Sequence, residues 1–284
     1  MDLPDKDLKS FIQSIRDSSK YDFSGYSEKS LKRRVAKLLT DNNLSISELT
    51  TKVKNDPIFL ERIVKDITVN TTELFRDPEI WHTLRYQILP EFKSKESINI
   101  WHVGCSTGQE VYSMLILLNE MDLFNKASVF ATDINSDVLE HAKEGIYKYL
   151  FNIGYLDNFD KVIKENPKDN EVFHNVPYSK YLKIDKSKDI IEINKFLREK
   201  PEFIVHDMVK ENNIFDIKFD LILCRNVVIY FNYELQNKVF NLFYNNLTQY
   251  GYLILGVHET ILGPFNNKFE KKGQVYLKKE IREG

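Results

Sequence analysis

The chain has 284 residues, of which 42% are hydrophobic, so it can build one large α/β domain and a smaller one without disulfide bonds. Its formal net charge of −2 argues against a general electrostatic attraction to nucleic acid. The two cysteines, Cys105 and Cys224, follow predicted strands without metal-ligand spacing, which favours a reducing compartment and no metal site. The first residues lack the pattern of a secretion signal, and no apolar run approaches the roughly 18 residues of a membrane helix. The sequence therefore predicts a cytoplasmic protein without membrane insertion.

Residues 1–72 are expected to form an N-terminal helical domain. The apolar positions that recur there at helical spacing are Phe11, Ile12, Ile15, Leu31, Val35, Leu38 and Leu39. A third helical segment is predicted to begin near Ser45, because Glu48 follows it at the spacing of a capping box.

The helix predicted around residues 29–37 is strongly basic. It carries five basic residues and no acid: Lys29, Lys32, Arg33, Arg34 and Lys37. Residues 1–70 as a whole hold 13 Lys and Arg against 11 Asp and Glu, a net charge of +2. Two interpretations are open at this point. The basic side chains either form the solvated face of an amphipathic helix or dock an acidic partner.

Residues 70–78 (NTTELFRDP) separate the helical part from the part that forms a sheet. Asp77 followed by Pro78 predicts a helix that is capped by Asp77 and runs to about Phe92. The polar side chains just before it are Asn70, Thr72 and Arg76. Ordinary capping explains such residues, and a place in a functional site is the alternative.

Residues 97–118 predict a strand, a tight loop and a helix. The apolar run SINIWHV is followed by Gly104 and Gly108, and then by apolar residues at helical spacing. Glycines allow a ligand to approach the backbone, and the start of a helix supplies unpaired N–H groups. This pattern is typical of the first βα turn of a nucleotide-binding sheet, although the three-glycine dinucleotide fingerprint is missing. A purely structural turn is the alternative.

The next predicted strand, residues 127–133, ends in Asp133, which is 29 residues after Gly104. An acid at the tip of the second strand of a βαβ unit is well placed to accept hydrogen bonds from both ribose hydroxyls. Asp133 would otherwise cap the following helix, predicted over residues 137–146. Asn135 or Ser136 already fills that need, which favours the ribose role.

The region from residue 150 to residue 200 is the least regular. Two runs of period two, residues 180–185 and 190–196, flank the polar sequence KSKD and predict a hairpin inserted into an otherwise parallel sheet. Its outer edge either binds an extended peptide or shields the sheet. Residues 202–208 then predict a strand that ends in polar residues.

Residues 219–224 (FDLILC) predict a buried parallel strand. Arg225 and Asn226 follow at its carboxyl end, where open α/β sheets bind ligands, and Tyr230 follows one short turn later, near the same crevice. A helix and two strands complete the predicted sheet, at residues 233–247, 251–256 and 274–278.

Four of these segments share their order and spacing with a known family over about residues 8–260. They are residues 70–76 (NTTELFR), 105–113 (CSTGQEVYS), 131–134 (ATDI) and 224–231 (CRNVVIYF). Together they resemble the CheR family of chemoreceptor glutamate methyltransferases. The resemblance implies an S-adenosyl-L-methionine-dependent protein-glutamate O-methyltransferase, with S-adenosyl-L-homocysteine as product. It also implies a helical domain over residues 1–72 for substrate recognition, a Rossmann-like class I methyltransferase domain over 73–284, and an inserted antiparallel β-subdomain over about 174–200.

The resemblance further implies roles for single residues. The cofactor contacts carried over by position are Asn70, Thr72, Arg76, Glu110, Asp133, Asp207, Met208, Arg225 and Asn226. Asp133 suits the ribose, Glu110 suits the ammonium group of the cofactor, and Asp207 and Met208 would border the adenine. Arg76 and Tyr230 would lie beside the reactive methyl group as catalytic residues.

The implied partner is the cytoplasmic helical domain of membrane chemoreceptors, whose acidic methylation helices would face the basic helix. The docking residues are then Lys32, Arg33, Arg34 and Lys37. Neither nucleic acid nor a metal is expected. Two other classes stay open: a methyltransferase of the same fold with another acceptor, and a non-catalytic module that binds the cofactor or its demethylated product as a signal.

Three places depart from the pattern of the family. Members usually have Glu at position 109 and Asn at position 207, where this chain has Gln109 and Asp207. The sequence Gly-His-Ser-Glu that usually follows the late strand is replaced here by GVHET at residues 256–260. These differences concern the adenine edge and the far wall of the expected site.

Overall fold

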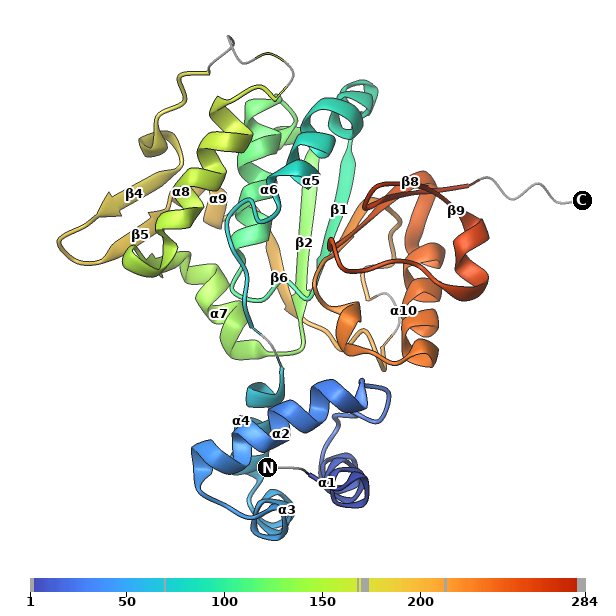
Figure 1. Ribbon diagram of the computed structural model, residues 1–284. Helices are drawn as coiled ribbons and strands as arrows, with labels where there is room; N and C mark the ends of the chain where they lie inside the picture. Colours follow the sequence, from blue (N-terminus) through green and yellow to red (C-terminus); the bar gives the residue numbers. More distant parts are fainter. Residues whose placement is uncertain (1–2, 69, 168, 170–173, 212–213, 280–284) are drawn as a thin grey trace, which may run out of the picture. The chain divides into compact units, whose positions relative to one another are not determined.

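The computed structural model describes residues 3–68, 70–167, 169, 174–211 and 214–279, and the chain forms two compact units. The helical unit comprises residues 1–69 and 227–241, and the sheet unit comprises residues 70–226 and 242–284. Figure 1 shows the elements of each unit. The helical unit thus includes a segment from the second half of the chain, which the sequence-based division at residue 72 does not contain.

Four helices form the N-terminal part of the helical unit. They are α1 (Asp5–Ser18), α2 (Glu28–Asn42), α3 (Ile46–Asn55) and α4 (Pro57–Ile67). The predicted capping box is confirmed, because Ser45 and Glu48 each accept a backbone N–H from the other residue. The third predicted segment is two helices, since Asp56 ends α3 and its side chain accepts the N–H of Phe59 at 2.9 Å to start α4.

The segment around Tyr230 is held by the loop that precedes α2. The N–H of Ser27 donates to the carbonyl of Tyr230 at 2.7 Å, and the N–H of Asn232 donates to the carbonyl of Gly25 at 2.8 Å. These bonds flank an antiparallel bridge between Tyr26 and Phe231, whose rings also make an edge contact at 4.9 Å. The helical unit therefore fixes the backbone on both sides of Tyr230.

The sheet unit is built on a seven-stranded mixed sheet with the order β6-β2-β1-β7-β8-β10-β9. The strands are β1 (Ile98–Val103), β2 (Ala127–Asp133), β6 (Glu202–Val205), β7 (Phe219–Cys224), β8 (Leu247–Leu255), β9 (Phe269–Lys272) and β10 (Val275–Lys278). The first five strands of this order run parallel, and β10 pairs antiparallel with both β8 and β9. Such an order with a reversal beside β1 is the doubly wound arrangement that binds ligands at the carboxyl ends of its strands.

The strand register brings the carboxyl ends of four strands to one edge of the sheet. Val103 of β1 pairs with Thr132 of β2, and Asp133 pairs with Val205 of β6. On the other side of β1, His102 pairs with Leu223 of β7. The loops that follow β1, β2, β6 and β7 consequently leave the sheet side by side.

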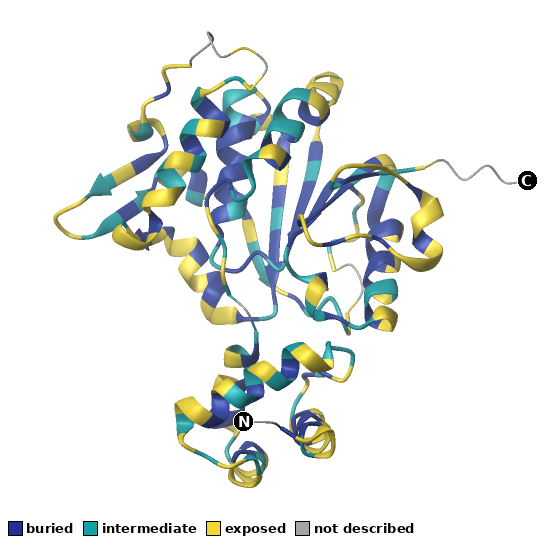
Figure 2. Cartoon of the chain, in the orientation of Figure 1, coloured by how far each residue is buried: buried dark blue, intermediate teal, exposed yellow. Residues whose placement is uncertain are grey.

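Helices α6 (Gln109–Glu120) and α7 (Ser136–Glu144) pack beside these strands. Gly108 has a φ of 86°, and a Cβ atom there would lie 2.9 Å from the Cβ of Ala142 in α7. Packing between the two helices therefore explains this glycine without any ligand. Every residue of β7 is buried, and Figure 2 shows the continuous buried core along the central strands.

Three sequence-based predictions need correction. Residues 78–92 are helical but change type, from α5 (Pro78–Thr83) to a π-helix (Leu84–Ile88) and a 3₁₀ helix (Leu89–Ser94), because a proline at residue 90 interrupts regular bonding. Ile146 does not end α7, since Gly145 terminates that helix and Ile146 begins β3 (Ile146–Lys148). The predicted hairpin is present as β4 (Leu182–Asp185) and β5 (Ile190–Ile193). Together with β3 it forms a separate three-stranded antiparallel sheet, which confirms the inserted β-subdomain but corrects the prediction that the hairpin joins the main sheet.

Further helices and helical turns lie between and after these elements. They are α8 (Ile153–Phe159), α9 (Lys195–Arg198), α10 (Tyr233–Asn246), a π-helix (Asp160–Lys164) and 3₁₀ turns at Phe124–Lys126, Leu150–Asn152, Tyr178–Lys180, Val228–Tyr230 and Gly263–Lys268. Within the described ranges, no helix combines the length and the apolar character needed to span a membrane.

Candidate functional site

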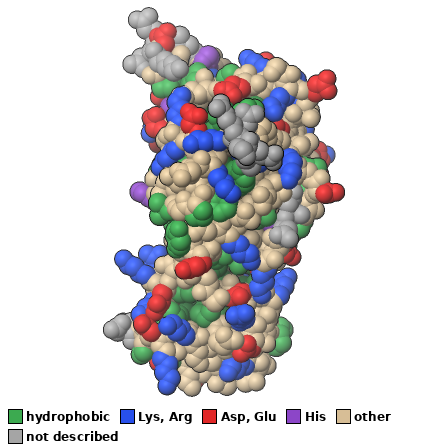
Figure 3. All heavy atoms as spheres, turned by 90° about the vertical axis from the view of Figure 1, so that its right-hand side faces the viewer, with side chains coloured by type: hydrophobic (Ala, Val, Ile, Leu, Met, Phe, Trp, Pro, Cys, Tyr) green, Lys and Arg blue, Asp and Glu red, His purple; other side chains and the backbone are tan. Residues whose placement is uncertain are grey.

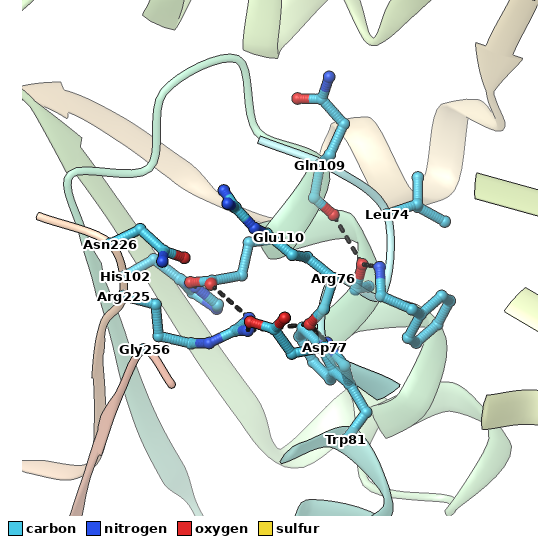
Figure 4. Close-up of polar contacts among 12 residues, drawn as sticks. Leu74, Arg76, Asp77, Trp81, His102, Gln109, Glu110, Arg225, Asn226 and Gly256 are labelled. Atoms are coloured by element: carbon cyan, nitrogen blue, oxygen red, sulfur yellow. Dashed lines mark hydrogen bonds and ion pairs between the residues drawn. The ribbon is translucent and has the colours of Figure 1, made fainter. Parts of the chain in front are cut away.

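A buried arginine connects three segments at the carboxyl edge of the sheet. The side chain of Arg225, only 1% exposed, donates from Nη1 to Glu110 at 3.0 Å. Its Nη2 donates to the carboxylate of Asp77 at 2.7 Å and to the carbonyl of Arg76 at 2.8 Å. Figure 4 shows this guanidinium between the two carboxylates. Arg225, predicted as a cofactor contact, thus commits its side chain to protein acceptors and holds the neighbouring groups in place.

Asp77 does not play the predicted capping role. It occupies the residue before α5 with a φ of 58°, and its side chain makes no capping hydrogen bond. The carboxylate instead forms the ion pair with Arg225. The carboxylate thus binds a charged partner that is 148 residues away in the sequence and not the backbone N–H groups at the start of α5, because hydrogen bonds between charged groups are stronger.

Glu110 lies in the first turn of α6 and is held through both of its oxygens. One oxygen lies 3.0 Å from Nδ1 of His102, and the other accepts from Arg225. Burial by itself would raise the pKa of Glu110, but the hydrogen bond from His102 and the charge of Arg225 outweigh it and hold the pKa below its usual value. Glu110 is therefore a carboxylate at neutral pH.

Asp133 provides a second carboxylate at the end of β2. Its two oxygens accept the N–H of Ser106 at 2.9 Å and the N–H of Asn135 at 3.0 Å. Within the part of the chain that the structure describes, Asp133 forms no ion pair. Burial raises the pKa of Asp133, and the backbone N–H groups only partly oppose this effect. The alternative role predicted for Asp133 was to cap α7. Asn135 caps this helix, because its side chain accepts the N–H of Asp137 at 3.0 Å.

The remaining predicted contacts follow the neighbouring strands. Asp207 and Met208 come just after β6, where Asp207 accepts the N–H of Val209 at 2.9 Å and burial raises its pKa. Asn226 follows β7 with a φ of 59°. Its N–H donates at 2.9 Å to Glu259, which also accepts the N–H of Gly256 at 2.7 Å. Glu259, four residues into the altered GVHET sequence, therefore anchors the far wall of the site.

Segment 70–76 is fixed by contacts that the sequence analysis missed. The hydroxyl of Tyr155 in α8 donates to the carbonyl of Thr72 at 2.9 Å, and Asn158 donates to the carbonyl of Leu74 at 3.3 Å. The N–H of Phe75 donates to the buried hydroxyl of Ser113 in α6 at 2.7 Å. In Figure 4 the side chain of Arg76 extends from this segment toward the region of Glu110. Two of the predicted residues, Arg76 and Glu110, are thereby brought to one place.

Tyr230 is packed within the helical unit. The guanidinium of Arg34 lies 4.7 Å from the centre of its ring and also donates to the carbonyl of Ile67. Burial lowers the pKa of Arg34. Arg76 belongs to the sheet unit, so the predicted pairing of Arg76 with Tyr230 at the reactive methyl group stays a prediction.

The four predicted docking residues differ in how much of their charge is available. Lys32 forms ion pairs with Asp5 and Glu28, and Arg34 is committed to Tyr230 and Ile67. Arg33 and Lys37 are exposed one turn apart, together with Lys29 a turn earlier, and Lys37 forms an exposed ion pair with Asp41. Figure 3 shows Lys and Arg side chains interleaved with acids on one face of the molecule. Arg33 and Lys37 are thus the two exposed residues among the four docking candidates.

Comparison with known proteins gives the family. Residues 6–68 match the model of the CheR methyltransferase all-alpha domain, and residues 70–153 and 168–277 match that of the CheR methyltransferase SAM binding domain. The chain belongs to the CheR methyltransferase family. The resemblance predicted from four motifs is therefore confirmed, and so is the predicted combination of an all-helical N-terminal domain with a Rossmann-like methyltransferase fold.

Individual relatives cover most of the chain. A methyltransferase of Pseudomonas putida named Cher3 is 32% identical over 94% of this chain and 93% of its own length. The chemotaxis protein methyltransferase of Borreliella burgdorferi is 33% identical over 75% of this chain and 72% of its own. That of Listeria innocua is 27% identical over 92% of this chain and 94% of its own.

This CheR protein uses S-adenosyl-L-methionine as its cofactor. The groups at the sheet edge fit the chemistry of that molecule. Asp133 accepts the backbone N–H groups of Ser106, Ile134 and Asn135, and a carboxylate with about four lone-pair sites keeps room for a ribose hydroxyl. Glu110 and Arg76 carry the charges that complement an ammonium group and a carboxylate, the two ends of an amino acid.

The raised pKa of Asp133 predicts a pH dependence for cofactor binding. Ribose hydroxyls donate to the ionised carboxylate, so affinity for S-adenosylhomocysteine should fall as the pH drops through the raised pKa. This loss should begin above the ordinary Asp range of about 4. Calorimetric titration of the ligand between about pH 8 and about pH 5 measures it. Asp133→Asn should bind weakly without this dependence, and a wild-type affinity that stays flat while the protein stays folded would contradict the assignment.

Proposed function

We propose that this protein methylates glutamate side chains of membrane chemoreceptors, forming carboxyl methyl esters for adaptation in chemotaxis. The family match and the relatives named chemotaxis protein methyltransferase support this acceptor. The observation that carries the proposal is that Arg225 holds both the carboxylate of Glu110 and the backbone carbonyl of Arg76, with the side chain of Arg76 extending toward Glu110, at the carboxyl edge of the sheet. Glu110 and Arg76 carry the charges that complement the amino-acid end of the cofactor.

The chemistry needs little from the protein beyond alignment. A glutamate carboxylate, with an ordinary pKa of about 4.3, is already ionised at neutral pH, so no general base is required. The bound cofactor supplies a methyl group on a positively charged sulfur, which leaves with the bonding electron pair as the carboxylate oxygen forms the new bond. Holding the reacting groups in line can supply as much as roughly 7–11 kcal/mol of the barrier reduction.

Each residue of the proposed site then has a positioning task. Asn70 and Thr72 precede Arg76 on the braced segment and would border the cofactor, as would Asn226 after β7. Asp207 and Met208 would border the adenine. Arg76 steadies the carboxylate of the cofactor or of the acceptor. Tyr230 orients the acceptor through its hydroxyl. Arg225 acts indirectly, because its side chain holds Glu110 and the backbone of Arg76.

The acceptor is tested with labelled methyl groups. The protein is incubated with methyl-labelled S-adenosylmethionine and membranes of the source cell, and methanol released by alkali is counted for each receptor band. Alkali-labile label in a receptor band is expected, since carboxyl methyl esters hydrolyse in base. Asp133→Asn serves as the matched control with weakened cofactor binding. Stable label, or label in another acceptor, would contradict a glutamate ester; no label from protein that binds the cofactor would favour the binding module.

Replacing Tyr230 by Phe tests the catalytic tyrosine. Tyr230→Phe should lower kcat by about tenfold or more, because one hydrogen bond to the acceptor is lost in the aligned state. Affinity for S-adenosylhomocysteine should stay unchanged. Tyr233→Phe, at a half-exposed position three residues later, is the matched control and should keep full activity. Full activity in Tyr230→Phe would remove this role.

Charge reversal tests the docking surface. The double variant Arg33→Glu with Lys37→Glu should raise the KM for receptor membranes by about tenfold at low salt, because it repels acidic methylation helices. The kcat and the affinity for S-adenosylhomocysteine should not change. Lys6→Glu with Lys54→Glu alters the net charge equally at exposed positions on α1 and α3 and should leave KM unchanged. Equal KM values for both double variants would contradict docking through α2.

A further inference from the structure

A histidine buried in the central sheet lies directly beneath Glu110. His102 is the fifth residue of β1 and has no exposed surface, although the other buried residues of this strand are apolar. Its Nδ1 atom is 3.0 Å from one oxygen of Glu110, while Arg225 holds the other oxygen at 3.0 Å. The carboxylate is therefore fixed at two points by partners from two different strands, β1 and the end of β7. Nothing else in the proposed site explains a histidine at this position.

The hydrogen bonds define which proton the ring carries. Glu110 is an ionised acceptor, so Nδ1 must hold the proton and donate it. The other ring nitrogen, Nε2, is buried and has no hydrogen-bond partner among the described residues. Nδ1 of His102 is therefore the donor in the hydrogen bond to Glu110.

Two carboxylates and one guanidinium surround this hydrogen bond, since Arg225 lies between Asp77 and Glu110. Arg225 holds one oxygen of Glu110, and His102 adds a donor to the other oxygen. The histidine thus fixes the direction in which the Glu110 carboxylate points.

We infer that His102 is a positioning residue, which aims the carboxylate of Glu110 at the ammonium group of S-adenosylmethionine. The inference rests on the proposed contact between Glu110 and that ammonium group, and it does not depend on which acceptor is methylated. His102 touches no reacting atom and acts only through Glu110. It consequently affects ligands that carry the amino-acid moiety and spares those that lack it.

Two variants and two ligands test this role. His102→Leu removes the donor, whereas His102→Asn keeps an N–H near the place of Nδ1. The ligands are S-adenosylhomocysteine, which has the ammonium group, and 5′-methylthioadenosine, which has the adenosine and sulfur but no amino acid. By calorimetry, His102→Leu should bind S-adenosylhomocysteine about tenfold more weakly and methylthioadenosine equally well. His102→Asn should restore most of the lost affinity.

Other outcomes overturn the inference. An equal loss for both ligands would show that His102 only supports the fold, and an unchanged affinity of His102→Leu for S-adenosylhomocysteine would show that Glu110 needs no such support. If circular dichroism shows that His102→Leu does not fold, a measurement on the wild-type protein tests the inference instead. Its ¹H–¹⁵N spectrum at neutral pH should show a proton on Nδ1 of His102, and an Nδ1 atom without a proton contradicts the role. Failure of glutamate methylation would leave all these binding results intact, so the two proposals fail separately.

Discussion

The buried guanidinium of Arg225 is the interaction on which the geometry of the site depends. A cation with a side chain that is 1% exposed is stable only if acceptors surround it, and here Glu110, Asp77 and the carbonyl of Arg76 supply them. Removing one partner of a buried pair leaves an uncompensated charge and typically costs about 3–5 kcal/mol. The end of β7, the start of α6 and the segment before α5 are therefore held as one piece. The left-handed backbone of Asp77 is tolerated because the ion pair offsets its strain.

Much of the sheet unit could be predicted because its signals are local. Parallel strands are buried on both faces, so β1, β2 and β7 are short apolar runs that stand out from their surroundings. The rule that ligands bind at the carboxyl ends of such strands then selects Asp133 without knowledge of the fold. Glu110 was found through its motif, and the register explains why both acids share one edge. Sequence reasoning placed these two acids at the edge of the sheet because the signal lies in one strand and the residues that follow it.

The parts that failed depend on contacts between distant residues. Asp77 directly precedes Pro78 at the start of α5, which is the local pattern of a helix cap. Its side chain instead binds Arg225, which is distant in the sequence. Tyr155 and Asn158 brace segment 70–76 from more than 80 residues away, and no window of sequence connects them. The separation of β3, β4 and β5 from the main sheet is of the same kind, since a hairpin pattern gives the pairing of two strands and not the sheet that they join. Burial of polar groups, rather than periodicity, decides each of these cases.

Arg34 shows why a cluster of charges is a weak guide to a docking surface. From sequence it is one of several basic residues on α2, but its guanidinium lies against the ring of Tyr230 and bonds to a backbone carbonyl. Burial of this charge lowers the pKa of Arg34. An acidic partner would have to compete with the tyrosine for the guanidinium. Backbone hydrogen bonds with Ser27 and Gly25, in the loop before α2, hold the same segment. The backbone around Tyr230 is therefore fixed to the N-terminal part of the helical unit. The helical unit therefore does more than present charges, because the conformation of the proposed catalytic tyrosine is set by its packing.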